Sequence, residues 1–379
     1  MISVIRLSVA ILLSLSLSLT SFAQSKTPQA GAPQAKAAGY LEEQWRLSGA
    51  PAVSVAIAQH GGLVFSKGIG FADLDNSFPA TGSTVYNIGS ISKVITVVAI
   101  MKLLEEGKIA LDDPIRKYVP QFPDKGSPIT IRQILTHTSG IRHYRPKDFP
   151  DSADGENLKP FHSFDEAINI FKNDPLLFKP GQYYFYSSYA VNLLQGVIEK
   201  TTQMSFEDYL RKNVWIPAGM MSTTVDVPER IVPNRAKGYL QDKGRTLNNP
   251  YGDLTYKFAS GGMLSTVEDL VRFAEALNHG TLLKPETTSQ MYRPQLKEVL
   301  RYQEKGPPTR EDFEQGLIWR MQKDKSGRTF VYHCGTVKGF NACLVNYVEE
   351  DLIVAIACNE EAIGFRPALE FAEFFRLAR

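Results

Sequence analysis

The chain has 379 residues, of which 43% are hydrophobic and 22% are charged. This is the composition of an ordinary globular protein of one or two domains, and it excludes a disordered, collagenous or coiled-coil chain. The formal net charge is only +2, from 42 basic and 40 acidic residues, without a long run of either sign, so nucleic acid is not expected as a partner.

The N-terminus predicts a secretory signal peptide over residues 1–23. Arg6 precedes an apolar run from Leu7 to Leu19, and Ser21 and Ala23 place small residues where a signal peptidase reads them. The alternative is an uncleaved membrane anchor, for which the run is short and interrupted by serines. We expect cleavage after Ala23, a periplasmic or secreted protein, and no membrane span in the mature chain.

Residues 24–38 are rich in Pro, Gly, Ala and Gln and lack periodicity, which predicts a flexible linker before a single domain over 39–379. A short helix is expected from Tyr40 to Leu47. Two apolar runs, 53–58 and 63–70, then flank a Gly-Gly turn and predict a β-hairpin.

The middle of the chain is predicted to be helical and its end to form strands. Apolar residues recur at helical spacing from Val94 to Leu104, so a helix should begin near Ser90 or Ser92 and end before Gly107. Further helices are expected over 164–173, 188–201, 206–213, 266–278 and 365–377, and strands over 316–321, 329–333, 340–348 and 352–359.

The strands at the two chain ends must meet in one sheet to be buried. The sequence therefore predicts an α+β fold, in which an antiparallel β-sheet is flanked by helices and an all-α subdomain forms a cleft with it.

Three cysteines are too few for a disulfide scaffold. A two-residue turn at Glu350-Asp351 would place Cys343 and Cys358 opposite each other on neighbouring strands. Two buried free thiols are the favoured interpretation, and a bridge between these two cysteines, with Cys334 free, is the alternative.

Ser90-Ile91-Ser92-Lys93 is the first candidate catalytic motif. A helix beginning at Ser90 would bring Lys93 to the same face one turn later. The amine can then act as a base toward the serine if burial and positive neighbours lower its pKa, and the helix N-terminus and the Ser90 amide favour an oxyanion. A capping serine with a solvated lysine is the alternative, but the preceding Asn87-Ile88-Gly89 turn and the following apolar helix favour catalysis.

Two more segments carry candidate residues. Tyr186 stands just before a predicted helix start, where its hydroxyl can pass a proton in a cleft, whereas packing is the expected role of the three aromatic residues before it. His333 and Gly335 end a predicted strand, where the glycine lets a substrate approach the strand edge and the histidine can orient it or transfer a proton. An ordinary strand-end histidine is the alternative.

Other catalytic patterns are missing from the sequence. It holds no Gly-x-Ser-x-Gly elbow, no His-Glu-x-x-His zinc motif, no Cys-x-x-Cys and no phosphate-binding loop, and its six histidines are scattered. Neither a metal nor another cofactor is expected.

Together, the three motifs resemble those of the serine β-lactamase and penicillin-binding-protein superfamily. Residues 90–93 resemble its Ser-x-x-Lys box, 186–188 its Tyr-x-Asn box and 333–335 its Lys-Thr-Gly box. The resemblance is to the branch of AmpC-type β-lactamases, DD-peptidases and esterases. The stretches that look most like the mitochondrial serine β-lactamase-like proteins are 129–144, 171–181 and 249–266.

The resemblance implies a mechanism and a β-lactamase/transpeptidase-like fold. Ser90 would attack a carbonyl, Lys93 and Tyr186 would share the proton transfers, and the amides of Ser90 and Thr336 would form the oxyanion hole. Water would hydrolyse the acyl-enzyme. It also implies that the substrate-binding residues are Ser188, His333, Gly335 and Thr336.

Two departures from the family pattern bear on the substrate. Ser188 stands in place of the asparagine that helps hold the substrate amide, and His333 in place of the lysine that helps bind its carboxylate. A histidine with a pKa of about 6.5 is mostly neutral at neutral pH. This favours a peptidase or esterase over a dedicated β-lactamase or D-Ala-D-Ala carboxypeptidase. Because His137-Thr138-Ser139 are adjacent in a predicted loop, we expect them to be structural.

The sequence thus predicts an exported serine hydrolase, a peptidase above all, acting on a small-molecule or peptide substrate with an acyl bond. An esterase or β-lactamase is the alternative within this class, and a non-catalytic binding domain is the alternative outside it. Whether the protein forms a homo-oligomer stays open.

Overall fold

The computed structural model describes residues 32–152, 156–361 and 363–376. The predicted signal peptide and residues 24–31 of the predicted linker lie outside this part of the chain. The linker prediction is wrong for residues 32–38, because helix α1 spans Ala32–Ser48. Ala37 and Leu41 of α1 are fully buried, and Tyr40 packs edge-on against Phe371 with ring centroids 4.9 Å apart. Tertiary packing therefore orders a segment that carries no periodic signal of its own.

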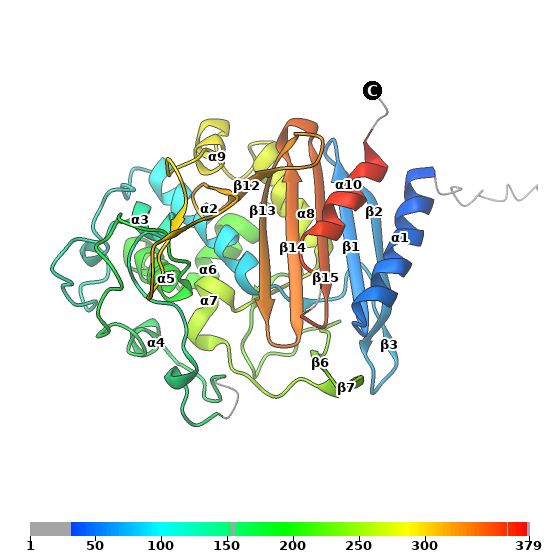
Figure 1. Ribbon diagram of the computed structural model, residues 1–379, viewed down its shortest axis with the longest axis horizontal. Coiled ribbons are helices and arrows are strands. Elements are labelled where there is room, and N and C mark those ends of the chain that lie inside the picture. Colours follow the sequence, from blue (N-terminus) through cyan, green and yellow to red (C-terminus); the bar gives the residue numbers. More distant parts are fainter. Residues whose placement is uncertain (1–31, 153–155, 362, 377–379) are drawn as a thin grey trace, which may run out of the picture.

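The core of the fold is an eight-stranded antiparallel sheet in the order β11-β12-β13-β14-β15-β1-β2-β3 (Figure 1). The predicted hairpin is confirmed as β1 and β2, and β15 pairs with β1, so that the first and last strands of the domain meet in the middle of the sheet. The strands are β1 Ala52–Gln59, β2 Gly62–Asp73, β3 Phe78–Pro79, β11 Glu314–Gln315, β12 Arg320–Lys323, β13 Thr329–Val337, β14 Phe340–Tyr347 and β15 Leu352–Cys358.

Helices cover both faces of this sheet. Helices α1 and α10 lie side by side on one face, and α8 packs on β1 and β15 from the other face (Figure 1). The remaining helices gather beside α8 as a helical lobe, so the predicted fold class is confirmed. The helices after α1 are α2 Ser92–Glu105, α3 Ile131–Leu135, α4 Phe164–Ile168, α5 Ser188–Thr202, α6 Phe206–Leu210, α7 Phe258–Gly261, α8 Val267–Asn278, α9 Pro285–Met291 and α10 Arg366–Phe375.

Short strands complete the lobe and its connections. A three-stranded sheet, β4-β8-β5, adjoins α2, and two hairpins pair β6 with β7 and β9 with β10. The bounds are β4 Tyr86–Asn87, β5 Thr224–Val225, β6 Tyr239–Asp242, β7 Arg245–Asn248, β8 Met263–Ser265, β9 Leu300–Arg301 and β10 Thr309–Arg310. No helix in the described ranges is long and apolar enough to cross a membrane.

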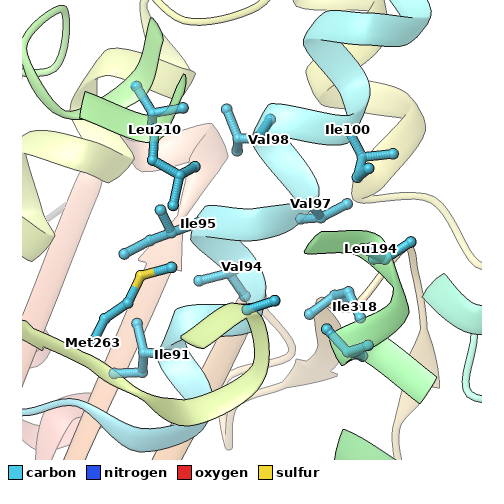
Figure 2. Packing of buried hydrophobic residues seen from close by; sticks show 14 of the residues in the cluster. Ile91, Val94, Ile95, Val97, Val98, Ile100, Leu194, Leu210, Met263 and Ile318 are labelled. Atoms are coloured by element: carbon cyan, nitrogen blue, oxygen red, sulfur yellow. The ribbon is translucent and has the colours of Figure 1, made fainter. Parts of the chain in front are cut away.

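Helix α2 is the central element of the lobe. Its side chains are apolar nearly all round, and Val94, Ile95, Val97 and Val98 are fully buried. Figure 2 shows these side chains among residues of α5, α6 and β8. A helix that is hydrophobic on every side must lie in a core. The first turn of α2, which holds Lys93, is consequently fixed from several directions.

Several predicted boundaries differ from the structure. Most of the predicted strand 316–321 is instead the turn that joins β11 to β12. In this turn the Gly316 amide donates to the Trp319 carbonyl, and Ile318 has a φ of 68°. The predicted helix 164–173 ends already at Ile168, and the helix predicted over 206–213 passes after Leu210 into a π-helical turn.

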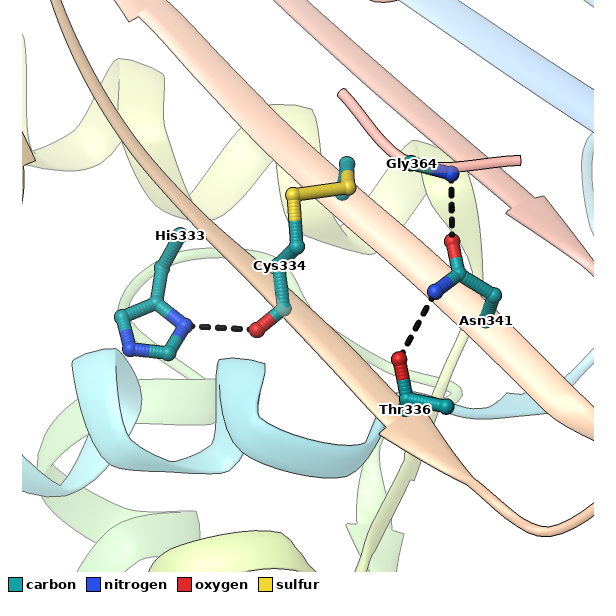
Figure 3. Close-up of a disulfide and its surroundings, with 6 residues drawn as sticks. His333, Cys334, Thr336, Asn341 and Gly364 are labelled. Atoms are coloured by element: carbon teal, nitrogen blue, oxygen red, sulfur yellow. Dashed lines mark hydrogen bonds between the residues drawn. A yellow bond between two sulfur atoms is a disulfide. The ribbon is translucent and has the colours of Figure 1, made fainter. Parts of the chain in front are cut away.

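The predicted strand register that placed Cys343 opposite Cys358 is wrong, and Cys343 is not a free thiol. The turn between β14 and β15 spans four residues, with Tyr347 paired to Leu352, so Cys343 faces Ile356 and Cys358 faces Asn341. Cys343 instead lies directly opposite Cys334 of β13, with a Cα–Cα distance of 4.1 Å, and the two form a disulfide (Figure 3). Cys358 is a buried free thiol.

This pairing predicts a defined pattern of thiol labelling. The folded protein should react poorly with iodoacetamide, since its one free thiol is buried. In denaturant without reductant only Cys358 should be alkylated, and all three cysteines should be alkylated after reduction. Peptide mass mapping checks this, and a Cys343–Cys358 peptide, or labelling of Cys334 without reductant, would contradict the structure.

Candidate active site

Ser90 lies in a tight turn that leads into α2. The turn is the 3₁₀ helix Gly89–Ile91, and α2 itself begins at Ser92. The Gly89 amide donates to the Asn87 side-chain oxygen over 3.1 Å, and the Ser92 hydroxyl donates to the Gly89 carbonyl over 2.7 Å. Gly89 has a φ of 47°, a conformation that favours glycine. These contacts hold Ser90 at the N-terminal end of the buried helix.

Lys93 reaches back to this serine. Its Nζ lies 2.9 Å from the Ser90 Oγ and donates to the Ser260 carbonyl over 2.6 Å. The side chain is fully buried. Burial, and then the charges of Lys257 and Arg320, hold the pKa of Lys93 well below its ordinary value. A neutral amine keeps a lone pair, which can accept the Ser90 hydroxyl proton while one N–H bonds Ser260.

Tyr186 approaches the same oxygen from the start of α5. Its side chain lies close enough to the Ser90 hydroxyl for that group to act on the pKa of Tyr186, and Lys93 Nζ lies 4.8 Å from the centre of its ring. Burial raises the pKa of Tyr186, so the phenol stays protonated near neutral pH. It is therefore suited to relay a proton as a neutral hydroxyl rather than as a phenolate. Tyr184 instead packs edge-on against Phe313. This is the packing role expected for the aromatic residues that precede Tyr186.

Two histidines hold Tyr186 in place. The rings of His137 and His143 lie 4.6 and 5.5 Å from the Tyr186 ring, centroid to centroid. Each accepts a backbone N–H at its Nδ1, His137 from Ser187 over 3.4 Å and His143 from Ser188 over 3.1 Å. Burial, followed by the nearby Lys93, lowers the pKa of His137 well below its ordinary value and that of His143 to about 3. Both rings are therefore neutral.

Strand β13 brings two backbone groups to Ser90. A Cβ atom at Gly335 would lie 2.0 Å from the Ile88 carbonyl oxygen and 2.5 Å from the Ser90 nitrogen. Only glycine permits this approach. A Cβ atom at Gly89 would likewise lie 2.8 Å from the Thr336 nitrogen. The amides of residues 90 and 336 consequently stand side by side.

The register of β13 explains why the Thr336 amide faces outward. The Cα–Cα distance of 4.1 Å between Cys334 and Cys343 marks a narrow pair, in which the backbone groups do not bond across the ladder. Because the pattern repeats every two residues, Thr336 and Asn341 form a narrow pair too. The Thr336 N–H therefore points away from β14, toward Ser90, where two such amides can stabilise an oxyanion.

The other two predicted substrate-binding residues, His333 and Ser188, are both buried. His333 donates from Nδ1 to the Cys334 carbonyl over 2.7 Å (Figure 3), and its buried Nε2 has no hydrogen-bond partner in the described part of the chain. Burial, Arg320 and Lys93 lower its pKa, so this nitrogen is an acceptor and not a cation. The Ser188 amide donates to His143, whose ring stacks on Tyr144, which places Ser188 in the wall of the site.

The structure thus gathers Ser90, Lys93 and Tyr186 around one oxygen. His333, Gly335 and Thr336 adjoin them, and Ser188 lies behind Tyr144. His143, Lys257 and Arg320 also belong to the site, but no local motif marks them in the sequence. Within the described ranges, no group of three or more His, Cys, Asp or Glu side chains could hold a metal ion.

A serine whose proton can pass to a neutral amine, beside two outward-pointing amides, is equipped for acyl transfer. The protein is a serine hydrolase. It belongs to the beta-lactamase family, whose model matches residues 37–373. The resemblance seen in the sequence is thereby confirmed.

Curated relatives and solved structures agree with this assignment. The human mitochondrial serine beta-lactamase-like protein LACTB is 30% identical over 85% of this chain and 77% of its own length. Penicillin-binding protein 4* of Bacillus subtilis is 25% identical over 81% of this chain and 68% of its own. The octameric penicillin-binding protein homologue from Pyrococcus abyssi has a TM-score of 0.74 at 28% identity, covering 90% of this chain and 76% of that one.

The glycine contact at β13 gives a direct test of the site. Gly335→Ala should reduce hydrolysis at least a hundredfold, because the added methyl group forces β13 away from Ser90, and overpacking of this kind typically costs about 1–3 kcal/mol. The activity and thermal unfolding of the purified variant are the measurements. Gly39→Ala is the matched control, since a Cβ atom there meets nothing within 4 Å. Full activity of Gly335→Ala would show that the contact is not needed.

Proposed function

We propose that the protein is a peptidase that works through an acyl-enzyme on Ser90. The observation that carries the proposal is the 2.9 Å contact between a buried Lys93 amine and the Ser90 hydroxyl. As the Ser90 Oγ bonds to the substrate carbonyl carbon, its proton passes to Lys93. The amides of Ser90 and Thr336 then receive the oxyanion.

Collapse of the tetrahedral intermediate breaks the bond to the leaving group. An amine leaves only if its nitrogen is protonated as that bond breaks. Tyr186, which burial keeps protonated, can hand over its own proton and take one from Lys93. Water then attacks the ester on Ser90, with Lys93 accepting its proton. As the ester bond breaks, Lys93 returns a proton to the Ser90 oxygen, and the carboxylic acid product is released.

Two features support cleavage of an amide rather than of a β-lactam. The residue in the position of the family's cationic lysine is His333, which is neutral and an acceptor at Nε2. Such a group suits an N–H of a substrate better than the carboxylate of a β-lactam. Among proteins of similar fold are a D-stereospecific amidohydrolase from Streptomyces and a D-amino acid amidase from Ochrobactrum anthropi. The hydrolase EstCE1 shares the fold as well, so esters belong in the test.

Activity-based labelling tests the nucleophile. A fluorophosphonate probe should modify Ser90 alone, because its hydroxyl is the one that contacts the buried Lys93 amine among the described residues. Intact and peptide mass spectrometry would locate the adduct. Ser90→Ala should abolish labelling and the hydrolysis of a peptide panel and of 4-nitrophenyl acetate while thermal unfolding stays unchanged. Labelling of another serine, or activity in the variant, would refute the proposal.

The two proton carriers should be separable from the nucleophile. Lys93→Met and Tyr186→Phe should each lower hydrolysis by about 10²–10⁴-fold, the usual contribution of general acid–base transfer. Tyr186→Phe should affect peptides more than activated esters, because a nitrophenolate leaves without protonation. Equal losses on both substrates would argue against the role of Tyr186 at the leaving group.

We also propose that the chain is exported. The supporting observations are the pattern of residues 1–23 and the Cys334–Cys343 disulfide, since disulfides persist in oxidising compartments. The human relative is named as mitochondrial, but a single basic residue followed by an apolar run differs from the Arg-rich, amphipathic pattern of a transit peptide.

Export predicts a shortened mature chain. When the full sequence is expressed in its own cellular setting, N-terminal sequencing of the product should begin at Gln24. Ala23→Arg should block this cleavage, because signal peptidase requires a small residue there. An unprocessed product in the membrane fraction would favour the anchor instead.

A further inference from the structure

Lys257, directly before α7, is a buried cation that the reaction does not use. The residue is 6% exposed, and its Nζ lies over the rings of Tyr144 and Tyr256, 5.0 and 5.2 Å from their centres. Among the residues that the structure describes, its ammonium group has neither a hydrogen-bond partner nor an ion pair. Burying an ammonium without a partner is costly, and an anion brought to it would offset much of that cost.

The side chain runs toward the nucleophile. A Cβ atom at Gly261 would lie 3.6 Å from the Lys257 Cδ and 3.9 Å from the Gly89 carbonyl carbon. The lysine methylenes therefore lie beside Gly261, next to the turn that holds Ser90. Lys257 also acts on the pKa of Lys93, in keeping with this proximity.

Among the residues that the structure describes, no acid forms an ion pair with Lys257. Glu156 acts on Lys257 only through a longer-range charge interaction. Asp148, which faces the neighbouring His143, is already paired with Arg142 over 2.7 Å. Burial lowers the pKa of Lys257 to about 8, which still leaves most of the population charged at pH 7.

Lys257 and the leaving-group side of the site are separate. Arg320 lies over the Tyr186 ring, 5.6 Å from its centre, and so belongs to the side on which the leaving group is protonated. Lys257 touches Tyr144, whose ring stacks on His143, and of these two rings it is His143 that contacts Tyr186. Two rings thus separate Lys257 from the proton donor, which places it beside the acyl part of a bound substrate.

A cavity of about 440 Å³ lies beside these segments. Its lining includes Asn87, Leu254 and Val337 as well as the acids Glu156 and Asp226. Asn87 precedes the nucleophile turn, Val337 follows Thr336, and the Leu254 carbonyl accepts the Lys257 amide over 3.0 Å. The cavity therefore adjoins the segments that flank the oxyanion-forming amides and Lys257.

We propose that Lys257 binds a carboxylate carried by the acyl part of the substrate. The inference rests on the proposed acyl-enzyme chemistry at Ser90 and narrows its substrate class to acyl groups that end in a carboxylate. The site would thus hold the negative charge on the part of the substrate that stays bound to Ser90, and not on the part that leaves.

Two esters of equal length test the specificity. Mono-4-nitrophenyl glutarate carries the carboxylate on its acyl chain, whereas 4-nitrophenyl pentanoate is its neutral counterpart. The wild-type protein should prefer the glutarate in kcat/KM. Lys257→Met should reduce this preference about tenfold to a hundredfold, mainly through KM, as expected for a charged hydrogen bond made in the ground state. Lys257→Arg should keep most of it.

A second lysine provides the matched control. Lys125 also lies over an aromatic ring, 5.3 Å from the centre of Phe122, but it donates to two carbonyls, those of Lys172 and Asp174. Lys125→Met should therefore leave the preference for the glutarate ester unchanged. A wild-type protein that hydrolyses both esters without preference, or a preference that survives in Lys257→Met, would overturn the inference while leaving the proposed function intact.

Binding without turnover separates the two proposals. Calorimetry of Ser90→Ala with glutaric acid monoanilide should show binding that is lost in Ser90→Ala/Lys257→Met and absent for pentananilide. If the wild-type protein hydrolyses no ester or peptide but this binding pattern holds, the anion site stands and the peptidase proposal fails. Binding that is indifferent to Lys257 would refute the anion site.

Discussion

The rest of the site depends on keeping one amine uncharged inside the protein. An ammonium has no lone pair and cannot take a proton from a serine. Lys93 therefore lies in the first turn of a buried helix that is apolar on nearly every side. Its partner is a backbone carbonyl and not a carboxylate. The positive charges of Lys257 and Arg320 act in the same direction. A carboxylate beside Lys93 would restore its charge and remove the base.

A second constraint is the contact between the sheet and the helical lobe. Gly335 and Gly89 let two backbone segments approach more closely than any side chain would allow. The nucleophile turn and β13 therefore act as one unit, with the two amides that face the reacting oxygen already aligned. The neutral rings of His137 and His143 extend this rigidity to Tyr186. The geometry needed for acyl transfer is built before any substrate arrives.

Periodicity and motifs were enough to predict the hairpin, α2, α5, the C-terminal strands and the grouping of Ser90 with Lys93 and Tyr186. The helix predicted over 40–47 forms the second half of α1, but residues 32–39 were missed because their order comes from packing against α10 and not from an amphipathic pattern. The predicted pairing of Cys343 with Cys358 failed because a turn of four residues, not two, sets the register of β14 and β15. The disulfide itself was missed because β13 continues past His333 and its hairpin with β14 places Cys334 opposite Cys343. Lys257 and Arg320 were missed because single cations reach the site from distant segments, and no spacing in the sequence announces them.

The pairing of β1 with β15 has a consequence for how the molecule is made. The Ala52 amide bonds the Asn359 side chain across 307 positions of the chain, in the middle of the sheet. The β1–β2 hairpin therefore waits for its neighbour until β15 has been synthesised. Contacts so distant in sequence slow folding. The growing chain exposes unpaired apolar strands throughout translation, and holding chaperones would shield it until the last strands arrive.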